Sequence, residues 1–554
     1  MFYALLPPSV PHRASASVRW APDKRKRRAI QGSWVLPAPL CCCSLPSVFL
    51  SVRAEYPILR ALYNVYFHPL AKVPGPRTWS ATRLPFVWSL LRGTIVHDIQ
   101  RLHCRYGPLV RIAPDEVTFK QPEAWNAIFV PRSGCPQFLK DPTWWKAQPG
   151  MPESLLSAID PDSHARIRRL LAPGFTTRAL KGQEPFLHRY VNLLVERLRE
   201  TTAEQAEIDI GPWFNFTTFD IFGDLGFGES FECLQHSRYH PWIALLFNSV
   251  KAASFVAAAR YFPLIEYLLM KCIPPSLRKM QRDHYQQIVD KVQRRLNYEL
   301  ERPDIMSHVI KQGRAKADDS DDDSGDGVGG LPIGVINTTF MVLTTAGSET
   351  TATVLSGTMN YLVQHPDSLK RLAGDVRQRF QSESDMTLDA LRHVPYLDAV
   401  LNEGLRLCTP VPWMLPRLVP PGGATVCGVW LPGGTPVSIQ AYAMNRDAQH
   451  FHRPDSFRPE RWLPESGANP DSPFFGDRRD TFHPFSLGPR SCLGQHLAWA
   501  ELRLILAKLV WTFDFDLPQD GAKRLNWEDL RTFLLVEKKP IYVQIKLRPE
   551  LQAS

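Results

Sequence analysis

The turn FSLGPRSCLG, Phe485–Gly494, places a single cysteine just before a long apolar stretch. A helix that starts after Cys492 presents free N–H groups and the positive end of its dipole to the sulfur, and Arg490 adds a full positive charge. Both effects favour a thiolate over a thiol. Gly488 and Gly494 allow the backbone to turn sharply or to approach a large, flat group. The turn therefore predicts a cysteine that acts as a nucleophile or as a metal ligand.

Three roles are open to Cys492 on these grounds. A nucleophilic cysteine needs a histidine base, and His496 lies one helical turn on, where its side chain is expected to point along the helix. A metal site must use this cysteine alone, because the chain contains no C-x-x-C pair, and thiolate-ligated haem iron meets that condition. The third role is a buried cysteine in front of a core helix.

A second chemical pattern, AGSETT, lies inside the apolar stretch Ile333–His365, which predicts one long buried helix. An acid inside such a helix is costly unless it serves a purpose. The Thr350 hydroxyl can donate to the carbonyl four residues earlier. Ala346 and Gly347 are small enough for a flat cofactor or O2 to approach the backbone, so Glu349 and Thr350 would stand beside such a group.

Charged residues at helical spacing form two further patterns. Glu403 and Arg406 share a helix face in EGLR, and Arg461 follows in FRPERW. His164 and Arg168 lie four residues apart in SHARIRR, so they also share a face. Each of these charged side chains lies at the surface unless the fold buries it. A buried charge must be fully paired with opposite charges and hydrogen bonds.

Taken together, the cysteine turn resembles the haem-binding signature of the cytochrome P-450 superfamily, F-x-x-G-x-R-x-C-x-G. Phe485, Gly488, Arg490, Cys492 and Gly494 all match it. The resemblance covers about Tyr56 to Pro549 and implies a mainly α fold with a small β-rich lobe. The segments YFHPLAKVPGP and MNRDAQHFHRPDSFRPERW look most like filamentous-fungal members that serve secondary metabolism.

The resemblance also implies roles for the other patterns. The cofactor is haem b, iron protoporphyrin IX, with Cys492 as its iron ligand and Ala346 and Gly347 beside it. Glu349 and Thr350 organise protons for oxygen activation. The remaining residues form a buried structural triad (Glu403, Arg406, Arg461) or hold the haem propionates (His164, Arg168, Arg417).

The activity implied is a monooxygenase that inserts one oxygen atom from O2 into a lipophilic small molecule. No flavin or ferredoxin module is recognisable, so a separate NADPH-dependent flavoprotein reductase is expected as partner. Aromatic residues that suggest an apolar substrate pocket are Phe247, Phe255, Phe340, Trp413 and Phe533. The alternatives are a reductase-independent haem-thiolate isomerase or dehydratase, a non-catalytic haem-binding protein, and a cysteine hydrolase.

The chain has 554 residues and a net charge of +10, and its basic residues are scattered apart from Lys24–Arg28. No nucleic-acid partner is therefore expected, and the basic excess suits an anionic membrane or an acidic protein partner. The widely spread cysteines suit a reducing compartment.

Residues 1–54 differ from the rest, which predicts one catalytic domain over residues 55–550. Ser33–Val52 is uncharged and long enough to span a bilayer, but three prolines interrupt it. By the positive-inside rule, the basic cluster before it would leave the N-terminus in the cytosol and carry the rest of the chain across. An anchor, a targeting segment and a mispredicted start of the gene are the three interpretations. The resemblance implies the cytosolic face of the endoplasmic reticulum membrane.

Overall fold

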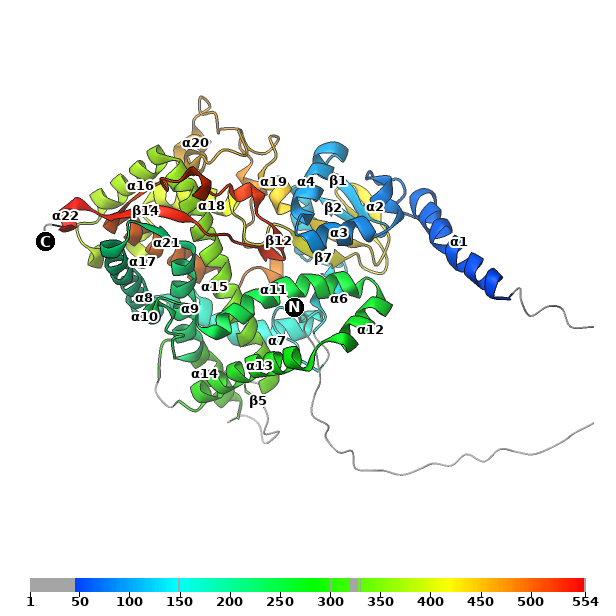
Figure 1. Ribbon diagram of the computed structural model, residues 1–554, viewed down its shortest axis with the longest axis horizontal. Helices are drawn as coiled ribbons and strands as arrows, with labels where there is room; N and C mark the ends of the chain where they lie inside the picture. The colour runs from blue at the N-terminus through cyan, green and yellow to red at the C-terminus, as the bar shows by residue number, and fades with distance from the viewer. Residues whose placement is uncertain (1–44, 148–149, 299–300, 318–326, 329, 553–554) are drawn as a thin grey trace, which may run out of the picture.

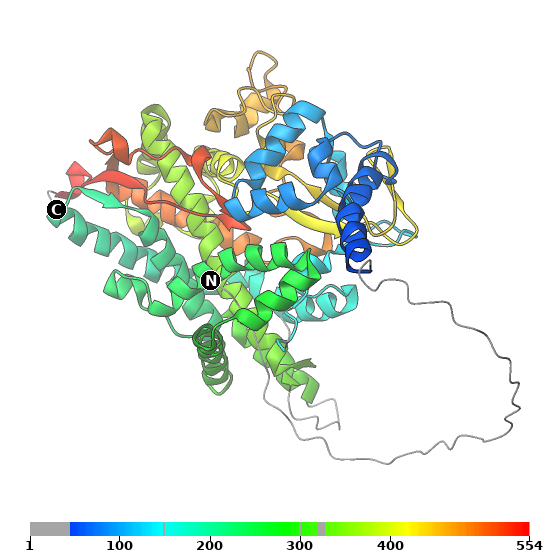
Figure 2. The ribbon, with the colours of Figure 1, turned by 45° about the vertical axis from the view of Figure 1, so that its right-hand side comes forward.

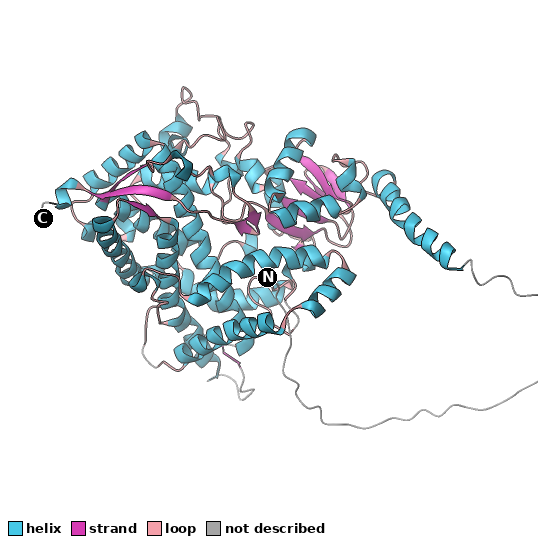
Figure 3. Ribbon diagram, viewed as in Figure 1, coloured by secondary structure: helices cyan, strands magenta, loops and turns pink. Residues whose placement is uncertain are grey.

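The computed structural model describes residues 45–147, 150–298, 301–317, 327–328 and 330–552 of the chain. Helices dominate it, and the strands gather in small sheets (Figures 1 and 3). The α-helices are α1 (Leu45–Tyr66), α2 (Arg77–Ala81), α3 (Leu84–Arg92), α4 (Ile95–Tyr106), α5 (Glu123–Phe129), α6 (Pro142–Trp145), α7 (Pro161–Leu171), α8 (Thr177–Glu204), α9 (Gly211–Phe227), α10 (Cys233–His236), α11 (Pro241–Arg260), α12 (Pro263–Cys272), α13 (Pro275–Leu296), α14 (Ile305–Ala317), α15 (Ile333–Gln364), α16 (Pro366–Arg379), α17 (Leu388–Leu391), α18 (Pro395–Leu407), α19 (Ala441–Asn445), α20 (Pro464–Ala468), α21 (Gln495–Thr512) and α22 (Pro549–Gln552). This agrees with the mainly α fold expected from the sequence.

Helix α15 crosses the centre of the molecule and organises the packing around it, as Figure 2 shows from a second side. It packs against α9, α18 and α21. Nearly all of its side chains between Ala352 and Val363 are buried, as its apolar sequence predicts. His365 caps the helix and Pro366 begins the next one, because proline cannot continue a preceding helix.

The strands form one five-stranded sheet in the order β1-β2-β10-β7-β3 and one three-stranded sheet in the order β11-β14-β4. Three further pairs are β5-β6, β8-β9 and β12-β13. The strands are β1 (Leu109–Ala113), β2 (Glu116–Phe119), β3 (Leu139–Lys140), β4 (Glu207–Asp209), β5 (Gly327–Val328), β6 (Leu331–Pro332), β7 (Met414–Leu418), β8 (Ala424–Val426), β9 (Val429–Leu431), β10 (Pro436–Ile439), β11 (Phe513–Asp516), β12 (Thr532–Phe533), β13 (Leu535–Val536) and β14 (Tyr542–Leu547). The two larger sheets lie toward opposite ends of the molecule in Figure 1.

Helix α1 is the first element of the described residues. It continues without a break through residue 54, where the sequence predicts the boundary between the N-terminal segment and the catalytic domain. Residues 33–44 of the uncharged stretch lie outside the described residues, and residues 45–52 belong to α1. Within the described ranges, no helix is both long enough and apolar enough to cross a bilayer.

Candidate functional site

The cysteine turn is held by its own backbone before it enters α21. The Cys492 N–H donates to the Phe485 carbonyl at 2.9 Å, and the short 3-10 helix η5 (Gly488–Arg490) lies between them. Gly488 has φ +75°, and a side-chain carbon there would lie 2.1 Å from the Phe129 carbonyl oxygen. No other residue fits this position. Helix α21 begins at Gln495, directly after the turn, as the sequence predicts.

The Cys492 side chain faces a space inside the protein. The residue is exposed, yet burial is the largest influence on its thiol and raises its pKa above the usual 9.0. A surface cysteine would show the exposure without the burial, so the accessible space is enclosed by protein. The Gly494 N–H and the Arg168 charge lower the pKa again and favour the thiolate.

Helix α15 presents a second accessible surface within an otherwise buried stretch. Ala346 is exposed, although Thr344, Ser348 and Glu349 around it are buried. The Thr350 hydroxyl donates to the Ala346 carbonyl at 2.7 Å, which confirms the predicted hydrogen bond to the residue four earlier. Ala346 of α15 and Cys492, just before α21, are thus both accessible, and the two helices pack against each other.

Gly347 lies where α9 and α15 pack closely. A side-chain carbon at this position would lie 3.0 Å from the Phe222 ring of α9. The missing side chain therefore allows α9 and α15 to approach each other. At Gly494, by contrast, there is room for a side chain. The nearest atom to an added side-chain carbon belongs to Phe175 and lies 3.9 Å away.

A cluster of cations lies beside the cysteine turn. Burial and the charges of Arg490, Lys140, Arg168 and Arg417 lower the pKa of His164 to about 3. Burial and Arg490 lower the pKa of Arg417 to about 9. Burial, Arg417 and Arg490 lower the pKa of Lys140 well below its usual value. Cations that destabilise one another in this way form a site for anionic groups, and two carboxylates would relieve the repulsion.

The sequence predicts that Arg490 supplies the positive charge beside the Cys492 sulfur, but the structure places Arg168 in that role. Arg490 donates to the carbonyls of Ala158 and Ile159, the latter at 2.7 Å, and so points to the loop before α7. Arg168 donates to the Ser491 carbonyl at 2.7 Å, and its charge acts on the Cys492 thiol. The positive charge near the sulfur thus comes from Arg168, because η5 directs the Arg490 side chain away.

A cavity of about 310 Å³ adjoins the cation cluster. Arg132, Arg417 and Arg490 supply its charged lining, together with residues from α5 and β8. Arg132 and Lys140 were missed by the sequence analysis, because neither lies in a recognisable motif.

The structural triad is confirmed. Glu403 accepts from Arg406 at 2.7 Å and from Arg461 at 3.1 Å, and all three side chains are fully buried. Trp462 adds a hydrogen bond to the same carboxylate at 2.8 Å. Asp477, which the sequence analysis did not identify, pairs with Arg461. Since Asp477 lies a few residues before the cysteine turn, the cluster anchors the segment that leads into it.

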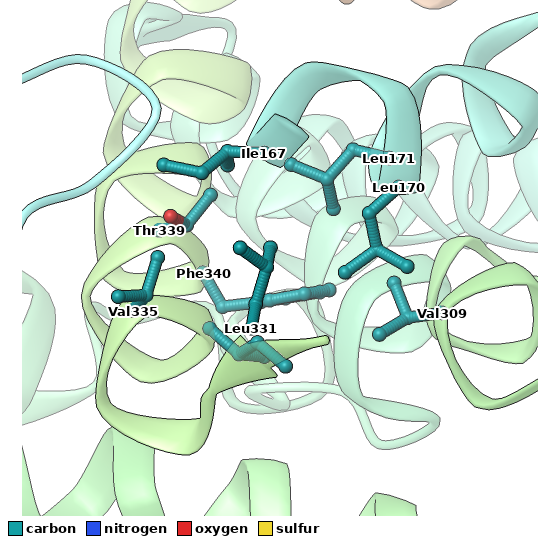
Figure 4. A pocket seen from close by; sticks show the side chains of 9 residues that line it. Ile167, Leu170, Leu171, Val309, Leu331, Val335, Thr339 and Phe340 are labelled. Carbon is teal, nitrogen blue, oxygen red and sulfur yellow. The ribbon is translucent and has the colours of Figure 1, made fainter. Parts of the chain in front are cut away.

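The predicted substrate aromatics do not lie together. Phe255 of α11 and Phe533 of β12 are neighbours, with ring centroids 6.0 Å apart. Phe340 lies instead in the core, 5.8 Å from Phe227, and lines a small apolar cavity between α7 and α15 (Figure 4). That cavity measures about 10 Å³, which is too small for an organic substrate. Phe247 belongs to a part of α11 whose side chains are not among those that the structure describes.

A mainly helical fold, an enclosed cysteine without a base partner and a neighbouring cation cluster are the attributes of a haem-thiolate protein. The comparisons identify the family. The cytochrome P-450 family model matches residues 76–545. Averantin hydroxylase of Dothistroma septosporum is 40% identical over 491 residues, 88% of each chain. The cytochrome P-450 monooxygenase lcsI of Purpureocillium lilacinum is 39% identical, over 91% of this chain and 94% of the relative.

The chain therefore belongs to the cytochrome P-450 family. It is a haem-thiolate monooxygenase of fungal secondary metabolism that uses haem b, O2, a redox partner and a lipophilic substrate. The residues fit that cofactor: the accessible sulfur of Cys492 lies beside a cluster of cations that repel one another. The expectations of fold, family, enzyme class and cofactor are thereby confirmed.

Proposed function

We propose that Cys492 is the axial iron ligand of this monooxygenase and that the haem lies between the cysteine turn and α15. The single observation that carries the proposal is the enclosed but accessible Cys492 side chain. When bound, the haem supplies O2 activation and the oxidation of a substrate C–H bond.

The chain's own residues hold and position the reacting groups in this proposal. His164 as a neutral donor and the cations Arg168 and Arg417 bind the two propionates, and Lys140 adds a further amine donor. Ala346 leaves room for O2, while the Thr350 hydroxyl and the Glu349 carboxylate hold protons near it. The Arg168 charge also stabilises the Cys492 thiolate.

We further propose that electrons come from an NADPH-dependent flavoprotein reductase. The net charge of +10 favours an acidic partner of this kind. Reductase-independent isomerisation is the competing activity, and it would proceed without NADPH.

Membrane association is proposed from exposed apolar side chains. They lie on α1, directly after it, and on α3 and α12, and include Ile58 (63% exposed), Phe67 (75%), Trp88 (63%) and Leu264 (70%). Surfaces of this kind bind the interface of a bilayer. We place the protein at the endoplasmic reticulum membrane on its cytosolic face, with residues 55–550 as one catalytic domain and residues 1–54 as a separate N-terminal segment.

The absorption spectrum of the reduced protein with carbon monoxide tests the iron ligand. Wild type is expected to give the strongly red-shifted thiolate band, and Cys492→Ala to lose it. Cys104→Ala, at an exposed position, is the matched control and should retain the band. A histidine-type band that ignores Cys492→Ala would refute the proposal. Substrate oxidation that depends on NADPH and the flavoprotein reductase would separate monooxygenation from isomerisation.

A further inference from the structure

The Glu349 carboxylate is engaged by two groups, and Thr350 is neither of them. Lys538 Nζ lies 2.8 Å from Glu349 Oε1. Asn215 Nδ2 donates to Glu349 Oε2 at 2.7 Å. These partners come from α9 and from the segment after β13, so three distant parts of the chain meet at one acid.

This ion pair is largely shielded from water. The side chains of Lys538 and Glu349 are 14% and 9% exposed. Burial lowers the pKa of Lys538, while the charges of Glu349 and Asp209 raise it again. Removal of either partner would take a close counter-charge from the other, nearly buried group, so the pair strongly constrains the carboxylate.

Glu349 and Thr350 face different neighbours, although they are adjacent. Consecutive helical residues point about 100° apart. Thr350 donates its hydroxyl to the carbonyl of Ala346, which is an accessible residue. The Glu349 carboxylate contacts Asn215 of α9 and Lys538 instead.

We propose that Lys538 is a positioning residue for the proton chemistry of this site. Its ion pair holds the Glu349 carboxylate toward α9, and the carboxylate turns toward Thr350 when that pair opens. The inference rests on the proton role of Glu349 and Thr350 in the proposed function. Asn215 of α9 donates to the second oxygen of the Glu349 carboxylate. The carboxylate therefore stays on the side of α15 that faces α9 as long as the ion pair with Lys538 is formed.

The segment that carries Lys538 also contacts α11. Glu537, its neighbour, pairs with Lys251 of α11 at 2.5 Å. The hairpin just before it carries Phe533, which lies 6.0 Å from Phe255 of α11. A substrate that displaces this hairpin would therefore move Lys538 relative to Glu349, and so link substrate binding to release of the acid.

The titratable groups around the pair are few and can be named. Lys538 faces Glu349 from the C-terminal segment, and Asp209 of β4 acts on Lys538. Tyr239 lies close enough for the Glu349 charge to raise its pKa. Asn215 of α9 is neutral. Among the described residues, Asp209 and Tyr239 are thus the titratable groups that face the pair, and variants of Glu349 separate its contribution from theirs.

The first test measures the pair without turnover. The holoenzyme is treated with an amine-acylating reagent, and mass spectrometry follows the modification rates of Lys538 and Lys539. In Glu349→Gln, Lys538 loses the carboxylate that raises its pKa, so its neutral amine fraction and its modification rate should rise about tenfold. The exposed Lys539 is the internal control and should not change. An unchanged Lys538 rate would refute the pair in solution.

The second test measures the pH dependence of NADPH oxidation and hydrogen peroxide release with the reductase. In Lys538→Met, the carboxylate loses the cation that holds it toward α9, so the midpoint of the pH profile should shift by about one unit from that of wild type. Lys538→Arg keeps the charge and should restore the wild-type profile. Lys539→Met is the matched control, and Glu349→Gln should remove the shift in the double variant.

The outcomes separate this inference from the proposed function. A Lys538→Met profile that overlays wild type, while Glu349→Gln alters peroxide release, would refute the positioning role and leave the role of Glu349 intact. A Glu349→Gln variant with wild-type release would refute both. If Lys538→Met fails to bind haem, the acylation rates and the Lys538→Arg profile still decide, because both use folded protein.

Discussion

Glu403 is the central acceptor of the buried cluster that it forms with Arg406, Arg461 and Trp462. Arg406, Arg461 and Trp462 all donate to it, and the Arg458 backbone N–H adds a bond at 2.8 Å. Although burial alone would raise its pKa, these partners together hold the pKa below its usual 4.5. The cluster is therefore fully satisfied, as a buried group of charges must be.

The depressed pKa of Glu403 has a consequence for stability. A carboxyl with a lowered folded-state pKa contributes stability that is present above its unfolded value of about 4.5 and is lost as the pH falls through the folded value. Glu403→Gln should lower the free energy of unfolding by about 3 kcal/mol near neutral pH, because Arg406 loses its counter-charge and Arg461 keeps only Asp477. The variant should also show a weaker loss of stability in acid.

Urea unfolding of the holoenzyme at neutral and acidic pH measures both effects. The exposed Glu465 provides the control Glu465→Gln, which should follow wild type at each pH. Equal unfolding midpoints for Glu403→Gln and wild type at neutral pH would contradict the role assigned to the cluster.

Residue patterns predicted those contacts that are local or follow a known spacing. The Glu403–Arg406 pair and the Thr350 hydrogen bond both lie within one helical turn. Lys538 and Asn215 could not be found in this way, since their contact with Glu349 depends on how distant segments fold together. The Arg490 prediction used distance along the chain, whereas the turn reverses the direction of the side chain.

Among the elements, the cysteine turn has the strictest local geometry. At Gly488 the nearest obstacle is the backbone oxygen of Phe129, which cannot rotate away. Gly488→Ala should therefore displace the turn and lower haem content about tenfold or more, through both the clash and the positive φ. Haem content and the carbon monoxide spectrum of the purified protein measure this.

Gly494→Ala is the matched substitution in the same turn. The protein leaves 3.9 Å to the nearest atom there, so the apoprotein should keep its wild-type melting temperature. If Gly488→Ala bound haem as well as Gly494→Ala does, the backbone clash would not limit the turn.

Element types could be predicted well where the sequence is strongly patterned. The apolar stretch from Ile333 gives α15, and the segment around the Gly-Gly turns gives β8, β9 and β10. In the β8-β9 hairpin, Cys427 and Gly428 adopt φ of 48° and 78°, as a tight two-residue turn requires. The start of α1 could not be predicted, because the composition changes within the helix rather than at its end.

At the scale of the whole molecule, exposed apolar residues gather on helices that are distant in sequence. Helices α1 and α12 both lie toward the right-hand end in Figure 1. On α12, Leu264, Ile265 and Leu268 are 70%, 52% and 51% exposed. Side chains of this size are stabilised by about 1.5 kcal/mol or more when fully buried, so three of them provide a substantial driving force for binding a bilayer interface.

Replacing Leu264, Ile265 and Leu268 by Ser should therefore lower the partition of the full chain onto phospholipid vesicles about tenfold or more. Flotation of the purified holoenzyme with vesicles measures the bound fraction, and the carbon monoxide spectrum verifies that the variant stays folded. Phe475→Ser removes an exposed aromatic (48%) from the loop before the cysteine turn, and this control should bind as wild type does. Equal binding of the α12 variant and wild type would place the membrane contact elsewhere on the chain, whereas equal losses in both variants would show that general surface hydrophobicity, and not α12, determines binding.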